Sequence, residues 1–177
     1  MIIELNMKNF TLKDIKHNVL NIHRGGSVLV LKNFTKNHSI KDLIDFLVMD
    51  LSYQNDMRQF DYNENAVLQD WFKISYNPKK SNVYTHSNTR QPLHTDNSWF
   101  SDPAELNFFY MEKQTKIGGE NTYYPLNRLK EDLQKDNKSL LNDLMSIPVV
   151  ISKGDGEYFN ETSIIDNNKI FWNFYRT

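Results

Sequence analysis

Apolar residues recur at helical spacing in two segments near the N-terminus. Over Thr11–His23 they return every three or four positions, Asp14 is placed to cap the first turn, and Gly25-Gly26 follows as a stop signal. Over Ser39–Ser52 the same spacing follows a serine, a residue type that favours the N-cap position of a helix. We therefore predict one helix over each of these two ranges.

Short β-branched and aromatic runs dominate the rest of the chain. A β-branched run at Ser27–Lys32 predicts a buried strand. Residues 52–70 are polar and irregular and predict a loop, which we expect to cover the functional site of the protein. From about Trp71 onward we predict short strands, interrupted by one helical segment from Leu126 to about Met145. The predicted strands are Lys73–Tyr76, Val83–His86, Glu105–Met111, Asn121–Tyr124, Val149–Ser152, Tyr158–Ile165 and Ile170–Tyr175. This order favours an α+β fold with an antiparallel sheet or barrel at its centre.

Composition narrows the class of protein without changing this picture. A chain of 177 residues fits a single domain, over residues 1–177, or part of a longer one. Hydrophobic residues make up 39% and aromatic residues 13%, enough for a packed core, which argues against wholesale disorder. The net charge of −1 gives no general attraction to nucleic acid or to an anionic membrane.

Localisation and redox chemistry follow from what the sequence lacks. No apolar run approaches the roughly 18 residues that a membrane-spanning helix needs, and the first residues do not have the layout of a signal peptide. The chain has no cysteine, which excludes disulfides, thiolate nucleophiles and cysteine-bound zinc. We therefore expect a cytoplasmic protein with no nucleic-acid or membrane partner.

The segment Gln91–Phe100 contains the most informative motif, His94-Thr95-Asp96. Side chains two residues apart on an extended segment share a face, so the imidazole and the carboxylate are expected to point the same way. One imidazole and one carboxylate are two of the three ligands in the facial triad that holds non-haem Fe(II). An isolated His-x-Asp is equally consistent with a surface histidine paired with a carboxylate, so its context has to decide.

The context adds a second candidate binding element. A loop at Lys116–Thr122 contains Gly118 and Gly119, which tolerate positive φ and allow close approach of the backbone. Asn121 and Thr122 follow them and can donate hydrogen bonds to a small carboxylate.

In this order of segments the chain resembles the taurine dioxygenase/clavaminate synthase-like Fe(II)/2-oxoglutarate-dependent oxygenases. The resemblance covers roughly residues 20–150 and rests on Gly25–Phe34, Gln91–Asp96 and Gly118–Thr122, followed by the helical segment from Leu126. It implies a double-stranded β-helix, a jelly roll of the cupin-like kind, with the N-terminal helices flanking it. It also implies His94 and Asp96 as ligands of Fe(II), and Asn121, with Thr122 as its neighbour, as the contact to the co-substrate 2-oxoglutarate.

Two further residues of the family have no counterpart here: a distal histidine and an arginine that pairs with 2-oxoglutarate. The other histidines, His17, His23, His38 and His86, all precede the motif, and His86, the nearest, is not a family ligand. The segment Ile165–Trp172 echoes the stretch before the distal histidine, with Trp172 in its place, yet indole cannot ligate iron.

We prefer the interpretation that the chain ends before the distal half of the barrel, with Ile170–Arg176 as an earlier strand. The jelly roll is then incomplete at the C-terminus, and an exposed sheet edge or a homo-oligomer covering that edge is expected. The alternative is a non-catalytic descendant that binds a small acid or a partner chain.

Overall fold

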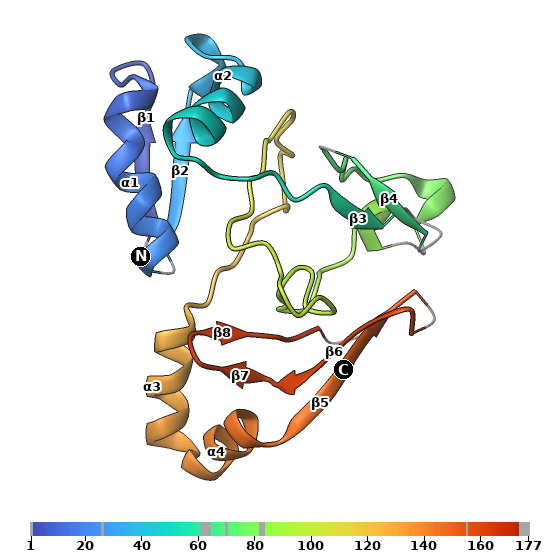
Figure 1. The fold of residues 1–177 in the computed structure, drawn as a ribbon. Helices are drawn as coiled ribbons and strands as arrows, with labels where there is room; N and C mark the ends of the chain where they lie inside the picture. Colours follow the sequence, from blue (N-terminus) through green and yellow to red (C-terminus); the bar gives the residue numbers. More distant parts are fainter. Residues whose placement is uncertain are drawn as a thin grey trace. The chain divides into compact units, whose positions relative to one another are not determined.

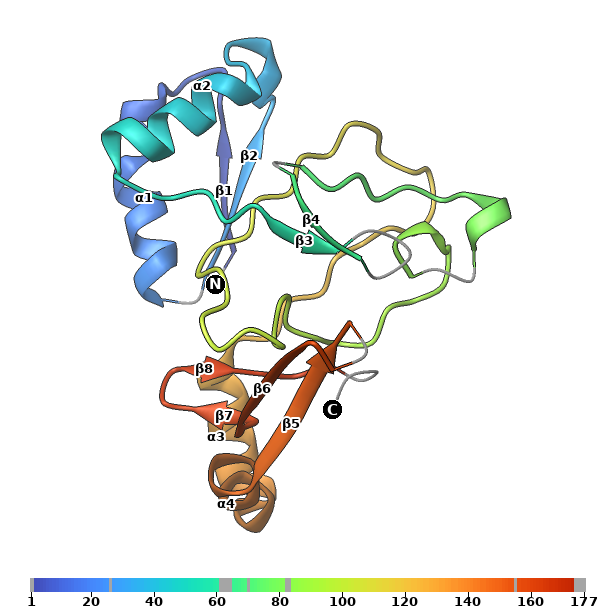
Figure 2. The same cartoon turned by 45° about the vertical axis from the view of Figure 1, so that its right-hand side comes forward.

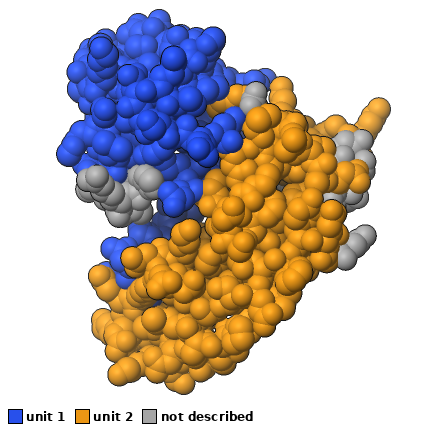
Figure 3. Space-filling model, viewed as in Figure 1, with its two compact units in different colours: residues 1–55, 105–129 blue, residues 56–104, 130–177 orange. Residues whose placement is uncertain are grey.

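The computed structural model describes residues 2–25, 27–60, 65–69, 71–81, 84–154 and 156–173. The chain forms two compact units, each assembled from two separate stretches of sequence. The first contains Met1–Asn55 and Glu105–Leu129, and the second contains Asp56–Ala104 and Lys130–Thr177 (Figure 3). We describe each unit separately.

A parallel pair of strands and a connecting helix begin the first unit (Figure 1). Strand β1 (Ile2–Asn6) pairs in parallel with β2 (Val28–Lys32), and helix α1 (Leu12–Gly25) forms the crossover that parallel neighbours require. The predicted cap is present, because the Asp14 carboxylate accepts hydrogen bonds from the backbone N–H and the hydroxyl of Thr11, both at 2.7 Å. The predicted first helix and the strand at Ser27–Lys32 are confirmed, whereas β1 was not predicted. Gly26, part of the predicted stop, lies outside the described residues.

The second predicted helix is also confirmed, with one difference in its winding. Helix α2 (Ile40–Asp45) continues directly into the π-helix η2 (Phe46–Asp50). Ser39 and Asp42 form a reciprocal capping box, with each side chain accepting from the other residue's backbone N–H. A short 3-10 helix, η1 (Phe34–Lys36), precedes α2. The core of this unit consists of Met7, Ile15, Val19, Phe34, Phe46 and Leu47.

The second unit begins with a short hairpin where the sequence predicted only a loop. Strands β3 (Arg58–Phe60) and β4 (Ala66–Leu68) pair antiparallel within residues 52–70, which corrects that prediction. Two 3-10 helices follow, η3 (Pro78–Lys80) and η4 (Tyr84–His86).

Several predicted strands do not form in the structure. No strand is assigned at Lys73–Tyr76, at 84–86, at Glu105–Met111 or at Asn121–Tyr124, and Val83 lies outside the described residues. Backbone bonds nevertheless bring two of these segments together, since Ser75 N–H donates to the Thr85 carbonyl at 3.3 Å. Apolar alternation shows which residues favour extended backbone, but a strand also needs a hydrogen-bonded neighbour, and single-sequence patterns do not supply that information.

Helices and hairpins complete the second unit (Figure 2). The predicted helical segment is confirmed as two helices, α3 (Leu126–Asp136) and α4 (Lys138–Ser146), and the Asn137 side chain between them accepts from Leu140 N–H at 3.0 Å. Strands β5 (Pro148–Lys153) and β6 (Tyr158–Ser163) form an antiparallel hairpin, and β7 (Ile165–Asp166) pairs with β8 (Lys169–Ile170). The strand predicted at Val149–Ser152 is thereby confirmed, and the one predicted at Tyr158–Ile165 is divided between β6 and β7. Of the strand predicted at Ile170–Tyr175, only Ile170 lies in a strand among the described residues. Residues 174–177, which include the end of the last predicted strand, lie outside the described residues.

Within the described ranges the strands form four two-stranded sheets. The double-stranded β-helix and the single domain over residues 1–177 therefore stay predictions. Among the helices that the structure describes, none is both long and apolar enough to cross a membrane.

Candidate metal centre

The motif His94-Thr95-Asp96 leads into a tight turn in the second unit. The turn covers residues 96–99, and Asn97 adopts a left-handed conformation with φ of 56°. Asparagine tolerates this conformation better than most residues, because its short polar side chain bonds locally. Phe100 N–H donates to the Asn97 carbonyl at 3.0 Å and closes the turn. The chain therefore reverses direction immediately after Asp96.

His94 and Asp96 point to the same side of this segment. Nε2 of His94 lies 3.4 Å from Oδ1 of Asp96, and the two side chains are 28% and 43% exposed, respectively. Thr95, between them, is bonded to the backbone of Trp172 instead. This arrangement presents one imidazole nitrogen and one carboxylate oxygen, side by side, to a partly open surface.

The hydrogen bonds of His94 determine which ring nitrogen faces the carboxylate. Nδ1 lies 2.9 Å from the Pro92 carbonyl oxygen, which can only accept, so Nδ1 carries the hydrogen. In the neutral ring, Nε2 then directs a lone pair toward the Asp96 carboxylate, and the two groups need a proton or a cation between them. The hydrogen bond with Asp96, and after it the Pro92 carbonyl, raises the pKa of His94, while burial opposes the rise.

These two donors fit two adjacent positions on a divalent metal ion. Nitrogen and carboxylate ligands bind such ions at about 2.1 Å, so two of them at right angles lie about 3 Å apart. The separation of 3.4 Å between Nε2 and Oδ1 is close to that value. A backbone carbonyl that holds Nδ1–H is also a common second-sphere partner of metal-bound histidine.

A third ligand is not found among the residues that the structure describes. No three His, Cys, Asp or Glu side chains come together there to hold a metal. His86 is held elsewhere, with Nδ1 at 3.0 Å from the Ser75 carbonyl oxygen. Among the described side chains, His94 and Asp96 therefore offer two metal donors without a third beside them.

Trp172 lies directly beside the motif. Thr95 N–H donates to the Trp172 carbonyl at 2.8 Å, and Trp172 N–H donates to the Thr95 hydroxyl at 2.9 Å. The segment that echoes the stretch before the family's distal histidine thus runs alongside His94 and Asp96. Its indole is a donor only and offers no lone pair to a metal.

The predicted co-substrate loop belongs to the first unit. Gly118 and Gly119 adopt positive φ values of 77° and 81°, as their position in a tight loop predicted, and the Thr115 hydroxyl donates to the Gly118 carbonyl. A Cβ on Gly119 would meet the Thr115 hydroxyl oxygen at 3.1 Å. Asn121 and Thr122 are exposed. Their predicted place beside His94 and Asp96 stays a prediction.

Comparison with known proteins gives one decisive result. The family model described as "Taurine catabolism dioxygenase TauD, TfdA family" matches residues 4–171. The chain belongs to the TauD/TfdA family. Comparisons with individually curated proteins and with solved structures gave no significant match.

The family match extends beyond the motifs that carried the resemblance, which covered roughly residues 20–150. It includes the last three residues of β1 at one end and β5 to β8 at the other. The match also covers the segment Ile165–Phe171. It ends one residue before Trp172, whose backbone contacts Thr95.

Sequence reasoning missed two buried polar residues that support the motif of this TauD-family chain. Ser98 is fully buried, and its hydroxyl donates to the Thr95 carbonyl at 3.0 Å. Asn160, on β6 and 7% exposed, donates from Nδ2 to the Ser98 carbonyl at 3.2 Å. Buried polar groups of this kind are retained when they are hydrogen-bonded. Asn160 carries no signal in the sequence, because its contact joins positions 62 apart, whereas Ser98 lies three residues from its partner Thr95 and was overlooked.

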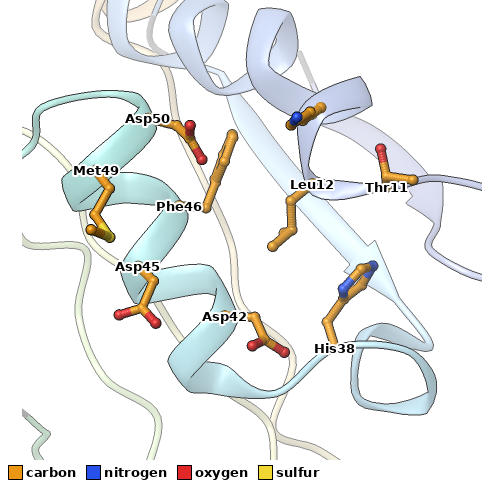
Figure 4. Close-up of a pocket in the computed structure, with 9 residues that line it drawn as sticks. Thr11, Leu12, His38, Asp42, Asp45, Phe46, Met49 and Asp50 are labelled. Carbon is orange, nitrogen blue, oxygen red and sulfur yellow. The ribbon is translucent and has the colours of Figure 1, made fainter.

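The first unit contains a groove that is separate from this motif. It has a volume of about 480 Å³ and lies between the start of α1 and the helices α2 and η2 (Figure 4). Two of its carboxylates already have partners, because Asp42 caps α2 and Asp45 bonds Lys41 at 2.6 Å. The groove contains none of the residues that the TauD/TfdA resemblance identifies, so we place the candidate site at His94 and Asp96.

Proposed function

We propose that this chain is a non-haem Fe(II)/2-oxoglutarate-dependent oxygenase, or the N-terminal portion of one, that oxidises a small polar substrate. The observation that carries the proposal is the His94–Asp96 pair in a chain of the TauD/TfdA family. Its Nε2 and carboxylate oxygen face each other 3.4 Å apart, while Nδ1 is bonded to the Pro92 carbonyl.

In this proposal two residues would bind the metal ion and two others would bind the co-substrate. His94 and Asp96 would hold Fe(II), with Pro92 fixing the tautomer and the ring orientation of His94. Asn121 and Thr122 would donate to a carboxylate of 2-oxoglutarate. Fe(II), when bound, supplies the activation of O2 that couples decarboxylation of 2-oxoglutarate to oxidation of the substrate.

A second candidate function is a non-catalytic descendant that binds a small acid or a partner chain. The observation that favours it is the lack of a third ligand among the described side chains. Two protein ligands hold Fe(II) less tightly than three, so the two candidates differ in their metal affinity.

Anaerobic titration with Fe(II), followed by calorimetry, tests the proposal. We expect the wild-type chain to bind one Fe(II), and we expect His94→Ala and Asp96→Ala each to weaken binding at least about tenfold, because each removes a ligand. His86→Ala is the matched control, since His86 is bonded to Ser75 and should leave the affinity unchanged. Equal affinity in the wild type and in His94→Ala would reject the metal centre and favour the non-catalytic alternative.

A further inference from the structure

Arg58, in the second unit, holds the chain on the far side of the turn that follows Asp96. Its Nε and Nη2 donate to the two carboxylate oxygens of Asp56, at 2.9 and 2.8 Å. Its Nη1 donates to Oδ1 of Asp102 at 2.9 Å, and Nη2 also donates to the Asp102 backbone carbonyl at 2.9 Å. One guanidinium therefore ties the beginning of β3 to residue 102.

The same guanidinium lies against the ring of Phe100. Its central carbon is 4.2 Å from the ring centroid, and Phe100 is 8% exposed. Phe100 packs in turn against Phe60 and Tyr158, with ring centroids 6.3 and 5.8 Å away. Arg58 thus covers one side of a buried aromatic cluster, and the cluster fixes the residue that closes the turn.

The contacts of Arg58 lead directly to the candidate ligands. Phe100 N–H closes the turn on the Asn97 carbonyl, next to Asp96. On the other side, Thr95 is fixed by the Trp172 backbone. Between these two anchors the Asp96 carboxylate faces Nε2 of His94 at 3.4 Å, and this geometry depends on the course of the backbone on both sides of Asp96.

We propose that Arg58 is a positioning residue of the metal centre: by clamping Phe100 and Asp102 it fixes the turn that orients the Asp96 carboxylate toward His94. The inference rests on the proposed function of His94 and Asp96 as ligands. It adds a residue that lies outside the motif and that donates no ligand itself.

The chemistry of the contacts requires arginine at this position. A planar fork can bond both oxygens of Asp56 while a third nitrogen bonds Asp102, and its flat face can stack on an aromatic ring. Lysine keeps the charge but has one nitrogen, which cannot bond Asp56, Asp102 and the carbonyl in the same geometry. Arg58→Lys therefore separates the effect of the fork from the effect of the charge.

Two measurements on the full chain test the inference. The first is the affinity and visible absorption of Co(II), a spectroscopic probe of the Fe(II) site, in the wild type, Arg58→Lys and Arg58→Gln. The second, made without metal, is hydrogen exchange at the Thr95 and Phe100 amides, compared with the amides of the β5–β6 ladder. Lys41→Gln is the matched control, because it removes an ion pair from the first unit.

We expect Arg58→Gln to weaken Co(II) binding by up to roughly tenfold, less than the loss of a group bonded directly to a ligand, because Arg58 acts through Phe100 and Asp102, and to change the absorption spectrum. Arg58→Lys should be intermediate, and Lys41→Gln should match the wild type. Exchange should accelerate at Thr95 and Phe100 while the β5–β6 amides keep their protection, which a general loss of stability would not produce.

Two results would overturn the inference: unchanged Co(II) affinity in Arg58→Gln, or an equal acceleration of exchange at all amides. A wild-type chain without His94-dependent Co(II) binding would reject the proposed function instead. The exchange comparison would then still decide whether Arg58 fixes the turn.

Discussion

At the scale of single residues, a backbone contact determines which ring nitrogen of His94 faces Asp96. The Pro92 carbonyl occupies Nδ1, so only Nε2 is left to face Asp96. The motif predicted that the two side chains share a face, because residues two apart on an extended segment point the same way. It could not predict the roles of Asn160 and Arg58, whose hydrogen bonds to Ser98 and Asp102 join positions 62 and 44 apart.

The ion pair between Asp56 and Arg58 predicts a dependence of stability on pH. The hydrogen bond from Arg58 lowers the pKa of Asp56 below its ordinary value of 3.8, while burial opposes the effect. A lowered pKa means that the folded state favours the ionised form, so this stabilisation is complete above about pH 4 and is lost as the pH falls through the folded-state pKa. We expect Asp56→Asn to lower the free energy of unfolding by about 1 to 2 kcal/mol at pH 7.

Urea denaturation at a series of pH values measures this effect. The difference between the wild type and Asp56→Asn should shrink as the pH is lowered below about 4, since the unfolded state then takes up the proton first, and it should level off once the pH is below the folded-state pKa of Asp56. Asp143→Asn, at an exposed position on α4, serves as the control. A difference that stays constant down to pH 2 would show that the loss comes from packing and not from the charge.

At the scale of elements, local signals predicted the helices well and the strands unevenly. Thr11 with Asp14 and Ser39 form the predicted caps, because a cap depends on residues close together in the chain. Asp42, which completes the capping box with Ser39, was not predicted. The hairpin β3–β4 was missed and the segment Glu105–Met111 was wrongly predicted as a strand, because pairing depends on partners elsewhere in the chain. Asn137 begins α4, which explains why one predicted helical segment is two helices.

The cap of α2 gives a prediction at this scale. Ser39→Ala removes the acceptor for Asp42 N–H and should lower the free energy of unfolding by about 1 kcal/mol. Ser39→Asn keeps an oxygen acceptor at the N-cap and should stay close to the wild type. Thermal or urea unfolding followed by circular dichroism compares the two variants. Equal losses in both would mean that the hydroxyl contact does not stabilise the helix.

At the scale of the whole molecule, the family match covers most of the chain, but the candidate metal site lacks a third donor among the described residues. The match spans residues 4–171, while no group of three His, Cys, Asp or Glu side chains that could hold a metal is found among the described residues. The sequence predicted the family from its motifs, and it shows that no histidine follows Asp96. It could not predict that the Trp172 backbone lies against Thr95, because that contact joins positions 77 apart.

The incomplete donor set predicts slow or absent turnover by the 177-residue chain. With two ligands, Fe(II) is held loosely and its geometry is poorly fixed, so 2-oxoglutarate should be decarboxylated no faster than by the His94→Ala variant. Succinate release, followed by NMR with Fe(II), ascorbate and a panel of small polar substrates, measures this.

Succinate formed above the His94→Ala background would contradict this prediction and would mean that a residue outside the described ranges, or a second copy of the chain, completes the site. The dependence on protein concentration separates these two sources, because a ligand from a second copy is lost on dilution and a ligand from the same chain is not.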